Sequence, residues 1–279
     1  MTSSPRPGPN VTRDQAVQLL DDLTALAIEA GRAILAIERS ALAVQGKADG
    51  SPVTQADLAA DRVIAAGLAA LCPAIPVVSE ERAPACTELA GSFFLIDPLD
   101  GTKEFIAGRD EFTVNIALVV DGTPLLGIIG APAKGVLWRG VAGAGAERLT
   151  LSADGAITER AAIRTRPQPA AGQPWVAAVS RSHGNARTEA FIDARPGAER
   201  RTLGSAVKLG RIAEGSADIY PRLGPTSEWD IAAGHALVSA AGGVVTDCSG
   251  ALIRYGIGHT QFLVPEFIAW GDPTAAPGR

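Results

Sequence analysis

The strongest constraint on the fold is the stretch I-D-P-L-D-G-T at residues 96–102, which follows the apolar run F-F-L. The apolar residues predict a buried strand that ends at Asp97. Pro98 then fixes φ and removes a backbone donor. Gly101 permits a sharp turn, after which a helix can begin. The sequence therefore predicts a strand, a tight turn and a helix N-terminus within one short segment.

This turn brings together groups that suit a metal ion and a phosphate. The carboxylates of Asp97 and Asp100 and the carbonyl of Leu99 are hard oxygen donors, which Mg²⁺ prefers. The backbone N–H groups of Gly101 and Thr102 would be free at the helix N-terminus, where a phosphate binds readily. For each aspartate alone, an Asx-type turn without a ligand is the alternative. The complete hexapeptide at the end of a buried strand favours the metal and phosphate site.

Three further carboxylates lie at the ends of predicted elements, where functional groups tend to gather. Glu80 follows an apolar strand, Asp57 lies in the first turn of a helix, and Asp230 opens another helix. Each alone would be a helix cap or a surface charge. Together with the turn, they could hold two or three Mg²⁺ ions around one phosphate.

The chain of 279 residues is long for one simple core and short for two independent domains. Strand and helix signals throughout predict a layered α/β or α+β architecture. The stretch 152–174, rich in Gly, Pro, Arg and Thr, separates two predicted lobes. We expect an N-terminal α+β lobe at residues 11–155 with most metal ligands. We expect a C-terminal α/β lobe at residues 156–279 with the substrate contacts.

Hydrophobic periodicity predicts the elements of both lobes. Thr12 and Gln15 form a capping box for a helix that should end near Ser40. Two later strands should join at a turn around Asp121-Gly122. The predicted buried stripe of a second helix consists of Val63, Ile64, Leu68 and Leu71. In the second lobe, helices are expected at residues 186–194, 206–215 and 230–243.

The formal net charge of −5 makes the chain a poor candidate for coating a nucleic-acid polymer. A small anion can still bind where metals and local cations reverse the sign of the potential. The candidate cations are Lys47, Lys103, Arg181, Lys208 and Arg222.

Other residue types exclude several classes of protein. Three cysteines without a C-x-x-C pair indicate neither a disulfide framework nor a zinc site and favour a reducing compartment. His183, His235 and His259 are too far apart to suggest a zinc cluster. No P-loop, H-E-x-x-H or G-x-S-x-G motif occurs. Because no signal peptide and no apolar run of membrane-spanning length is visible, we expect a cytoplasmic protein without a transmembrane segment.

Glu80, the D-P-L-D-G-T turn and W-D-I-A-A-G at residues 229–234 together resemble the inositol monophosphatase superfamily of Mg²⁺-dependent, Li⁺-sensitive phosphatases. The resemblance extends from about Lys47 to Phe262. It implies an α+β fold, the layered α-β-α-β-α sandwich of that superfamily.

Within the superfamily, the chain is similar to the CysQ branch, the 3'(2'),5'-bisphosphate nucleotidases. The similarity lies in D-G-T-K-E-F-I, E-F-T-V-N-I-A-L-V (111–119), S-R-S-H (180–183), G-S-A-V-K (204–208) and Y-P-R-L-G-P-T-S-E-W-D (220–230). It implies hydrolysis of the 3'-phosphate of adenosine 3',5'-bisphosphate to AMP and phosphate, with the 5'-sulfated form as a second substrate, in sulfur metabolism. Ala206 departs from the pattern, since relatives often carry a second Ser there.

The resemblance also implies a role for each site residue. One Mg²⁺ would be held by Glu80, Asp97 and the Leu99 carbonyl, and a second by Asp97, Asp100 and Asp230. Asp57 and Thr102 would activate the attacking water, and Asp57 would help to hold a third metal. The N–H groups of Gly101 and Thr102 would grip the phosphate. The other substrate contacts would be His183, Ser205, Lys208, Arg222 and Asp230.

Two alternatives remain open at this point. The same metals could serve an inositol monophosphatase or a fructose-1,6-bisphosphatase. A metal- and phosphate-sensing module without turnover is the non-enzymatic alternative, but the presence of Asp57 and Thr102 argues against it. For any of these, we expect a monomer or a homodimer.

Overall fold

The computed structural model describes residues 9–38, 45–46, 52–82, 89–257 and 262–278. Lys47, Cys86 and His259, like the predicted helix end at Ser40, lie outside these ranges. Among the described residues, no helix is both long enough and apolar enough to cross a lipid bilayer.

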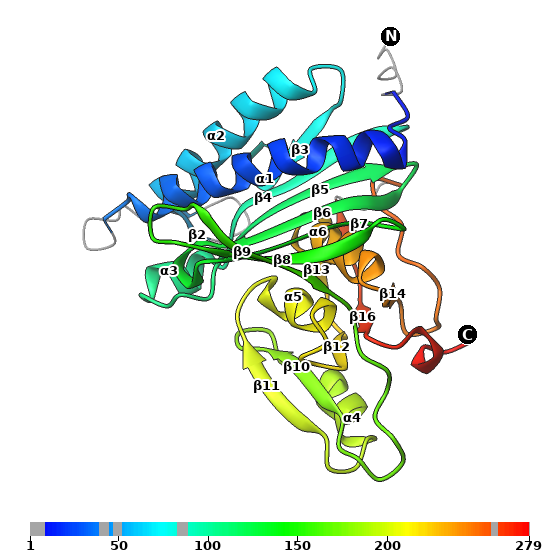
Figure 1. The fold of residues 1–279 in the computed structure, drawn as a ribbon. Helices are drawn as coiled ribbons and strands as arrows, with labels where there is room; N and C mark the ends of the chain where they lie inside the picture. Colours follow the sequence, from blue (N-terminus) through cyan, green and yellow to red (C-terminus); the bar gives the residue numbers. More distant parts are fainter. Residues whose placement is uncertain (1–8, 39–44, 47–51, 83–88, 258–261, 279) are drawn as a thin grey trace.

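The helices are α1 (Arg13–Leu35), α2 (Gln55–Leu71), α3 (Thr102–Ile106), α4 (Ala186–Asp193), α5 (Val207–Ala213) and α6 (Glu228–Ala240). Figure 1 shows that α1 and α2 cover one face of a seven-stranded sheet, and that α5 and α6 lie between this sheet and a five-stranded sheet. Helix α4 packs on the outer face of the smaller sheet. The predicted α-β-α-β-α sandwich is therefore confirmed.

The seven-stranded sheet has the order β3-β4-β5-β6-β7-β8-β9. Its strands are β3 (Val77–Ser79), β4 (Ser92–Asp100), β5 (Thr113–Val120), β6 (Thr123–Ala131), β7 (Val136–Val141), β8 (Gly145–Leu151) and β9 (Ile157–Ile163). Strand β3 runs parallel to β4, and the later neighbours are antiparallel. The predicted turn between β5 and β6 is confirmed, since Asp121 and Gly122 have φ values of 46° and 73°.

The chain crosses from the large sheet to the smaller sheet later than the predicted lobe boundary. The predicted lobe boundary lies between residues 155 and 156, yet β9 follows it and pairs with β8 in the large sheet. Strand β9 contains only half-buried and exposed residues, so it carries little of the apolar signal by which the other strands are found. The chain leaves the large sheet only after residue 163. The lobe boundary at residues 155 and 156 remains a prediction.

The five-stranded sheet has the order β11-β10-β12-β16-β14. Its strands are β10 (Val176–Ser180), β11 (Glu199–Leu203), β12 (Ile219–Arg222), β14 (Val244–Thr246) and β16 (Phe267–Trp270). Two short pairs complete the described strands: β1 (Gln45–Gly46) with β2 (Pro52–Val53), and β13 (Thr226–Ser227) with β15 (Leu263–Val264).

Helix α1 begins where the sequence predicts and ends earlier. The Gln15 side chain accepts a 2.8 Å hydrogen bond from the Thr12 N–H, and the Thr12 hydroxyl accepts one from the Gln15 N–H, which completes the capping box. The helix ends at Leu35, so the prediction of an end near Ser40 was wrong.

Helix α2 buries a narrower apolar stripe than predicted. Ile64 and Leu68 are buried, but Val63 is half-buried, and Leu71 at the last position is 40% exposed. The remaining buried residues are small or acidic: Ala56, Asp57, Ala60 and Asp61. Apolar periodicity cannot reveal these residues, and the buried acids point to a role beyond packing.

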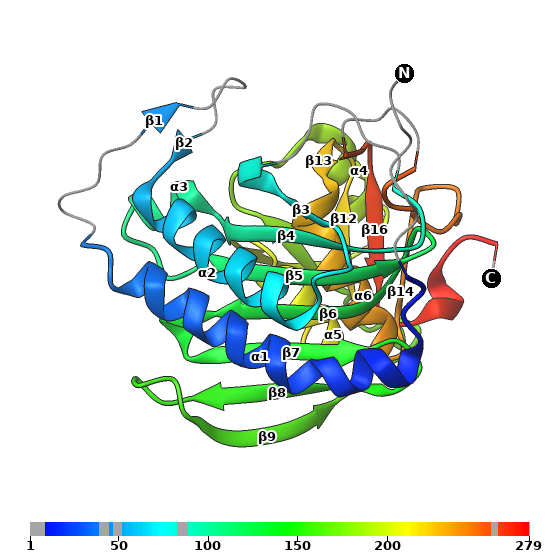
Figure 2. The same ribbon diagram turned by 90° about the horizontal axis from the view of Figure 1, so that it is seen from above.

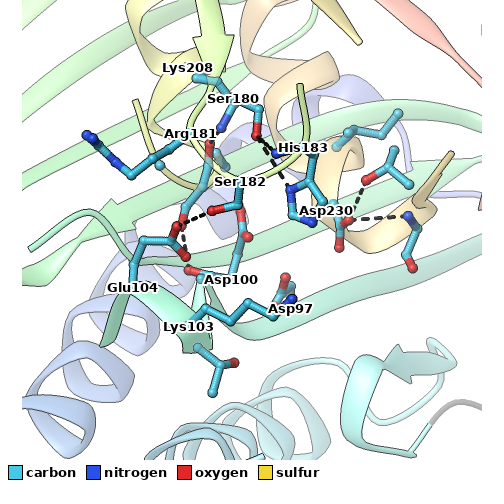
Figure 3. A pocket seen from close by; sticks show the side chains of 18 of the residues that line it. Asp97, Asp100, Lys103, Glu104, Ser180, Arg181, Ser182, His183, Lys208 and Asp230 are labelled. Carbon is cyan, nitrogen blue, oxygen red and sulfur yellow. Dashed lines mark hydrogen bonds between the residues drawn. The ribbon is translucent and has the colours of Figure 1, made fainter. Parts of the chain in front are cut away.

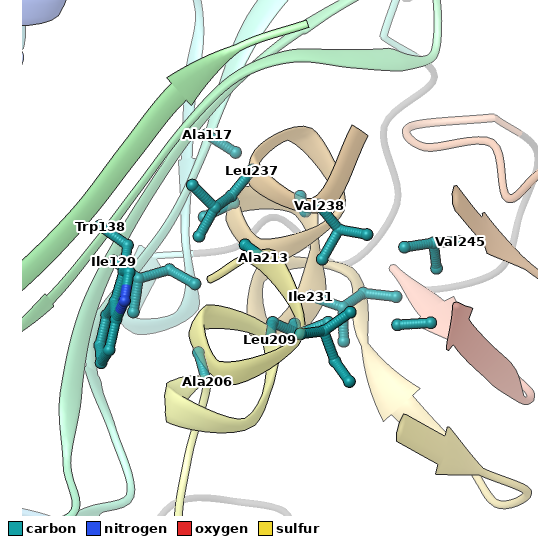
Figure 4. Close-up of a cluster of buried hydrophobic side chains, with 14 of the residues drawn as sticks. Ala117, Ile129, Trp138, Ala206, Leu209, Ala213, Ile231, Leu237, Val238 and Val245 are labelled. Carbon is teal, nitrogen blue, oxygen red and sulfur yellow. The ribbon is translucent and has the colours of Figure 1, made fainter. Parts of the chain in front are cut away.

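Helix α6 packs closely against β6 in the hydrophobic core between the two sheets. Figure 4 shows Leu209 of α5 and Leu237 of α6 between the large sheet and Val245 of the smaller sheet. A Cβ atom at Gly127 of β6 would lie 2.0 Å from the carbonyl oxygen of Ala233. Only glycine permits this approach, which places α6 at a fixed position beside the large sheet.

Candidate active site

The D-P-L-D-G-T segment forms the predicted strand, turn and helix, with one difference. Strand β4 continues to Asp100 instead of ending at Asp97, and its register against β5 shifts between these residues. Gly101 has a φ of 93° and is the N-cap of α3. Figure 2 shows α3 and the beginning of α2 at the same end of β4. The local sequence thus aims both aspartates toward one end of the large sheet.

A cavity of about 250 Å³ opens beside this segment, between the large sheet and the elements of the second lobe. All but one of the predicted site residues line it: Glu80, Asp97, Leu99, Asp100, Gly101, Thr102, His183, Ser205, Lys208, Arg222 and Asp230. Asp57 does not line the cavity and lies directly behind Thr102. The fold therefore brings the predicted residues of both lobes to one place.

Asp57 is held from two sides. One oxygen accepts hydrogen bonds from the Thr54 N–H at 2.8 Å and the Thr54 hydroxyl at 2.7 Å, which fixes the carboxylate in the first turn of α2. The other oxygen accepts a 2.8 Å hydrogen bond from the Thr102 hydroxyl. The Leu99 carbonyl lies 3.3 Å from the same hydroxyl. Asp57 thereby orients a hydroxyl group that faces the cavity.

The carboxylates that line the cavity repel one another. Asp97 is 1% exposed, and burial, followed by the charges of Glu80 and Asp100, raises its pKa well above the usual range. Burial and the charge of Asp230 raise the pKa of Asp100 to about 7, although Lys208 opposes the shift. Like charges at this density are stable only when protons or cations neutralise them.

These residues fit a divalent metal ion by their chemistry. The donors are carboxylate and carbonyl oxygens, which suit a hard cation such as Mg²⁺. Asn115, opposite Asp97 on β5, is fully buried, and its Oδ1 atom has no hydrogen-bond partner in the described part of the chain. Among the described residues, however, no group of three or more His, Cys, Asp or Glu side chains lies close enough together to hold a metal ion.

Asp230 comes to the cavity from the first turn of α6. Its Oδ2 atom accepts hydrogen bonds from the Thr226 hydroxyl at 2.5 Å and from the Ser227 N–H at 3.2 Å. The neighbouring Trp229 ring packs against Phe262, with 5.7 Å between the ring centroids. Both contacts fix the carboxylate at the helix N-terminus, where the helix dipole favours negative charge.

The second lobe supplies positive charge to the opposite wall (Figure 3). Lys208 is 4% exposed, and its ammonium group donates hydrogen bonds to the carbonyls of Ser205 at 2.6 Å and Leu203 at 3.4 Å. Burial lowers its pKa to about 8, although the charge of Asp100 opposes the shift. Burial and the cations Arg222, Lys103 and Lys208 also lower the pKa of His183. This wall suits an anionic ligand.

The other histidine among the described residues, His235, packs in the hydrophobic core. His235 is buried in α6, and its Nδ1 atom lies 2.9 Å from the Tyr255 hydroxyl. It is outside the cavity lining, as expected for a residue that packs on its helix.

Several residues at the site were not among the predicted site residues. Glu104 and Ser182 line the cavity, and Asn115 and Glu111 lie beside lining residues. Glu104 follows the hexapeptide closely, so its position was a usable signal. Ser182 lies in the S-R-S-H segment, and Glu111 and Asn115 lie in E-F-T-V-N-I-A-L-V. Their contacts at the site arise from strand pairing and from packing between lobes, which local sequence does not reveal.

Comparison with known proteins identifies the family of the chain. The model of the inositol monophosphatase family matches residues 16–277. The 3'(2'),5'-bisphosphate nucleotidase CysQ of Escherichia coli (strain K12) is 40% identical over 253 residues, which cover 89% of this chain and 98% of that protein. The protein of the same name from Buchnera aphidicola is 36% identical over 259 residues, or 90% of this chain and 93% of that protein.

A solved structure of the same family superposes well. The crystal structure of CysQ from Bacteroides thetaiotaomicron, a bacterial member of the inositol monophosphatase family, has a TM-score of 0.72 and 35% sequence identity. The match covers 90% of this chain and 96% of that chain. The chain therefore belongs to the inositol monophosphatase family, as its D-P-L-D-G-T and W-D-I-A-A-G motifs predict.

Proposed function

We propose that this protein is a Mg²⁺-dependent phosphatase that hydrolyses the 3'-phosphate of adenosine 3',5'-bisphosphate to AMP and phosphate. One observation carries the proposal: a single cavity is lined by a group of carboxylates, most of them from the first lobe, and by cations, most of them from the second lobe. A substrate with two phosphates needs metal ions at the reacting group and positive charge at the other. The curated relatives named 3'(2'),5'-bisphosphate nucleotidase support this choice.

The metal side would consist of Glu80, Asp97, the Leu99 carbonyl, Asp100 and Asp230. Two or three Mg²⁺ ions held there would supply Lewis-acid stabilisation of the phosphoryl charge and of the leaving oxygen. The mutual repulsion of the carboxylates supports this part of the proposal, because cations would neutralise it.

The Thr102 hydroxyl would accept a proton from the attacking water as it passes its own proton to the carboxylate of Asp57. Since the Thr102 hydroxyl donates its hydrogen to Asp57, its lone pairs are left to accept a hydrogen bond from water. The backbone N–H groups of Gly101 and Thr102 would hold the phosphate oxygens beside this water. Hydrolysis would then proceed without a covalent enzyme intermediate.

His183, Ser205, Lys208 and Arg222 would contact the nucleotide. Lys208 and Arg222 would pair with the second phosphate, and His183 would contact the base or the ribose. The 5'-sulfated form of the nucleotide would use the same cationic wall. We further propose that the protein acts in the cytoplasm, as a monomer or homodimer, and is inhibited by Li⁺. The free thiols of Cys72 and Cys248 fit a reducing compartment.

The test is phosphate release from adenosine 3',5'-bisphosphate and from inositol 1-phosphate, measured side by side with Mg²⁺ and with EDTA. We expect the nucleotide to be the better substrate and EDTA to abolish both activities. A preference for the inositol ester would retain the metal chemistry and reject the nucleotide. Turnover that persists in EDTA would reject the metal-dependent mechanism.

A further inference from the structure

Two acidic residues outside the proposed metal site connect the lobes. The Oε2 atom of Glu111, from the first lobe, accepts hydrogen bonds from the Gly204 N–H at 2.9 Å and from the Arg181 guanidinium at 2.8 Å. The main-chain carbonyl of Glu111 accepts a 2.8 Å hydrogen bond from the Ser205 hydroxyl. Lys134 lies 3.9 Å from the other carboxylate oxygen. Glu111 thus contacts two separate loops of the second lobe.

Glu104 makes a parallel contact at the cavity itself. It lies in α3, is 6% exposed, and accepts a 2.9 Å hydrogen bond from the Ser182 hydroxyl (Figure 3). Ser182 follows Arg181, which is bound to Glu111. The two carboxylates therefore hold the same loop at successive residues.

The close packing at this junction leaves little freedom between the lobes. A Cβ atom at Gly204 would lie 2.7 Å from the carbonyl oxygen of Glu111 and 3.2 Å from the Glu104 Cγ atom. Ser205 adopts a φ of 48°, which is unusual for a residue other than glycine, and the Asp100 carbonyl lies 2.8 Å from its hydroxyl. A residue held in this region indicates that its surroundings over-determine its position.

The two loops that Glu104 and Glu111 contact contain or lie beside the residues that we propose to bind the nucleotide. The loop that follows β10 contains His183, and the loop that leads into α5 contains Ser205, while Lys208 lies in the first turn of α5. The Lys208 ammonium group is tied to this second loop by its hydrogen bond to the Ser205 carbonyl. Burial lowers the pKa of Lys208, and the charges of Asp100, Glu104 and Glu111 partly oppose this shift. The two glutamates therefore influence both the position and the charge of the nucleotide side.

We propose that Glu104 and Glu111 are positioning residues that hold the two nucleotide-contacting loops over the metal side and so set the preference for a nucleotide bisphosphate over small phosphate monoesters. This inference rests on the proposed function. Neither residue is assigned to the metals, to the attacking water or to the reacting phosphate. A small monoester, which cannot reach the second lobe, should depend on them far less.

The experiment compares Glu111→Gln and Glu104→Gln with the wild-type enzyme on adenosine 3',5'-bisphosphate and on p-nitrophenyl phosphate. Each variant should raise the KM for the nucleotide by about tenfold, because a charge-assisted hydrogen bond is weakened. The kcat for the small ester should change by less than about threefold, since the reacting groups stay in place. Binding of AMP, measured by calorimetry, should weaken in parallel with KM.

Glu266→Gln is the matched control. Glu266 also pairs with an arginine of the second lobe, Arg187, at 2.7 Å, but it lies outside the cavity lining and should leave both substrates unaffected. Ser182→Ala tests the Glu104 contact from the opposite side and leaves the carboxylate in place. If thermal unfolding shows that Glu104→Gln does not fold, Ser182→Ala still decides whether the Glu104 contact sets the preference; the Glu111 contact is tested in the same way by Arg181→Met.

Three outcomes are distinguishable. Loss of nucleotide preference in the glutamate variants, with the small ester unaffected, supports the inference. An unchanged ratio of the two kcat/KM values, whether both fall equally or neither falls, overturns it. If the wild-type enzyme itself shows no preference for the nucleotide, the proposed function fails, and this inference fails with it.

Discussion

The Thr102 hydroxyl donates a 2.8 Å hydrogen bond to the carboxylate of Asp57, across a separation of 45 residues. Asp57 is fixed in turn by Thr54 at the start of α2. A capping box that usually serves only to begin a helix here also orients a hydroxyl at the cavity. The pair joins the first turns of two helices, and the proposed activation of water depends on it.

Removal of the Thr102 hydroxyl should therefore impair the chemical step. We expect Thr102→Val to lower kcat by about 100-fold, the usual contribution of a positioned proton acceptor. Thr102→Ser keeps the hydroxyl and should retain most of the activity. Steady-state kinetics measures both variants, and Mg²⁺-dependent thermal stabilisation checks that the metal side is intact. Equal activity of the Val and Ser variants would refute the role of the hydroxyl.

Removal of the Asp97 charge should raise the stability of the metal-free protein and lower its activity with Mg²⁺. Because burial and nearby carboxylates raise the pKa of Asp97, its ionised form disfavours the folded state without metal near pH 7. We expect Asp97→Asn to be more stable than the wild type in EDTA, as measured by thermal unfolding. We also expect it to lose at least about 100-fold in activity with Mg²⁺.

With Mg²⁺ bound, the wild type should become more stable than Asp97→Asn. Since a ligand that binds only the folded state stabilises it, Mg²⁺ at about 100 times its Kd should stabilise the wild type by about 3 kcal/mol. Asp97→Asn should gain much less. If Mg²⁺ stabilised both proteins equally, Asp97 would not be a metal ligand.

The buried His235 should make stability depend on pH in weak acid. Burial lowers its pKa from 6.5 to about 4, so between these values the unfolded chain binds a proton that the folded state does not. Stability contributed by the neutral ring is therefore fully present above pH 6.5 and is lost as the pH falls toward 4. Between pH 7 and pH 5, this group alone should cost about 2 kcal/mol.

A pair of variants isolates the titration of His235. His235→Gln should flatten the pH dependence of the free energy of unfolding between pH 7 and pH 5, as measured by urea denaturation. Tyr255→Phe removes the same hydrogen bond but keeps the imidazole, so it should retain the wild-type slope. An unchanged slope in His235→Gln would show that other groups dominate in this range.

Two glycines on β6 should respond differently to a methyl group. In Gly127→Ala, the new Cβ would lie 2.0 Å from the carbonyl oxygen of Ala233, so α6 must move, and the free energy of unfolding should fall by about 1–3 kcal/mol. Activity should also fall, because α6 carries Asp230. Gly130→Ala meets only ordinary contacts of 3.8 Å or more and should be close to neutral. Chemical denaturation compares the two, and similar losses in both would contradict the close approach of α6.

The sequence by itself determined the local geometry of the site. Pro98 and Gly101 restrict or permit particular backbone dihedrals, so the strand, turn and helix at Asp97 and Asp100 follow from short-range sterics. Thr12 with Gln15, and Asp121 with Gly122, likewise fix a helix start and a hairpin turn through neighbouring residues. The paired D-P-L-D-G-T and W-D-I-A-A-G motifs were specific enough to predict the family.

Only the tertiary structure decided which distant groups meet and how they are charged. The contact of Glu111 with Gly204 spans 93 residues and depends on the packing of the two sheets around α5 and α6. The raised pKa of Asp97 and the lowered pKa of Lys208 arise from burial, which local sequence does not fix. Short-range dihedrals can be read from neighbouring residues, whereas desolvation and contacts between lobes exist only once the core has formed.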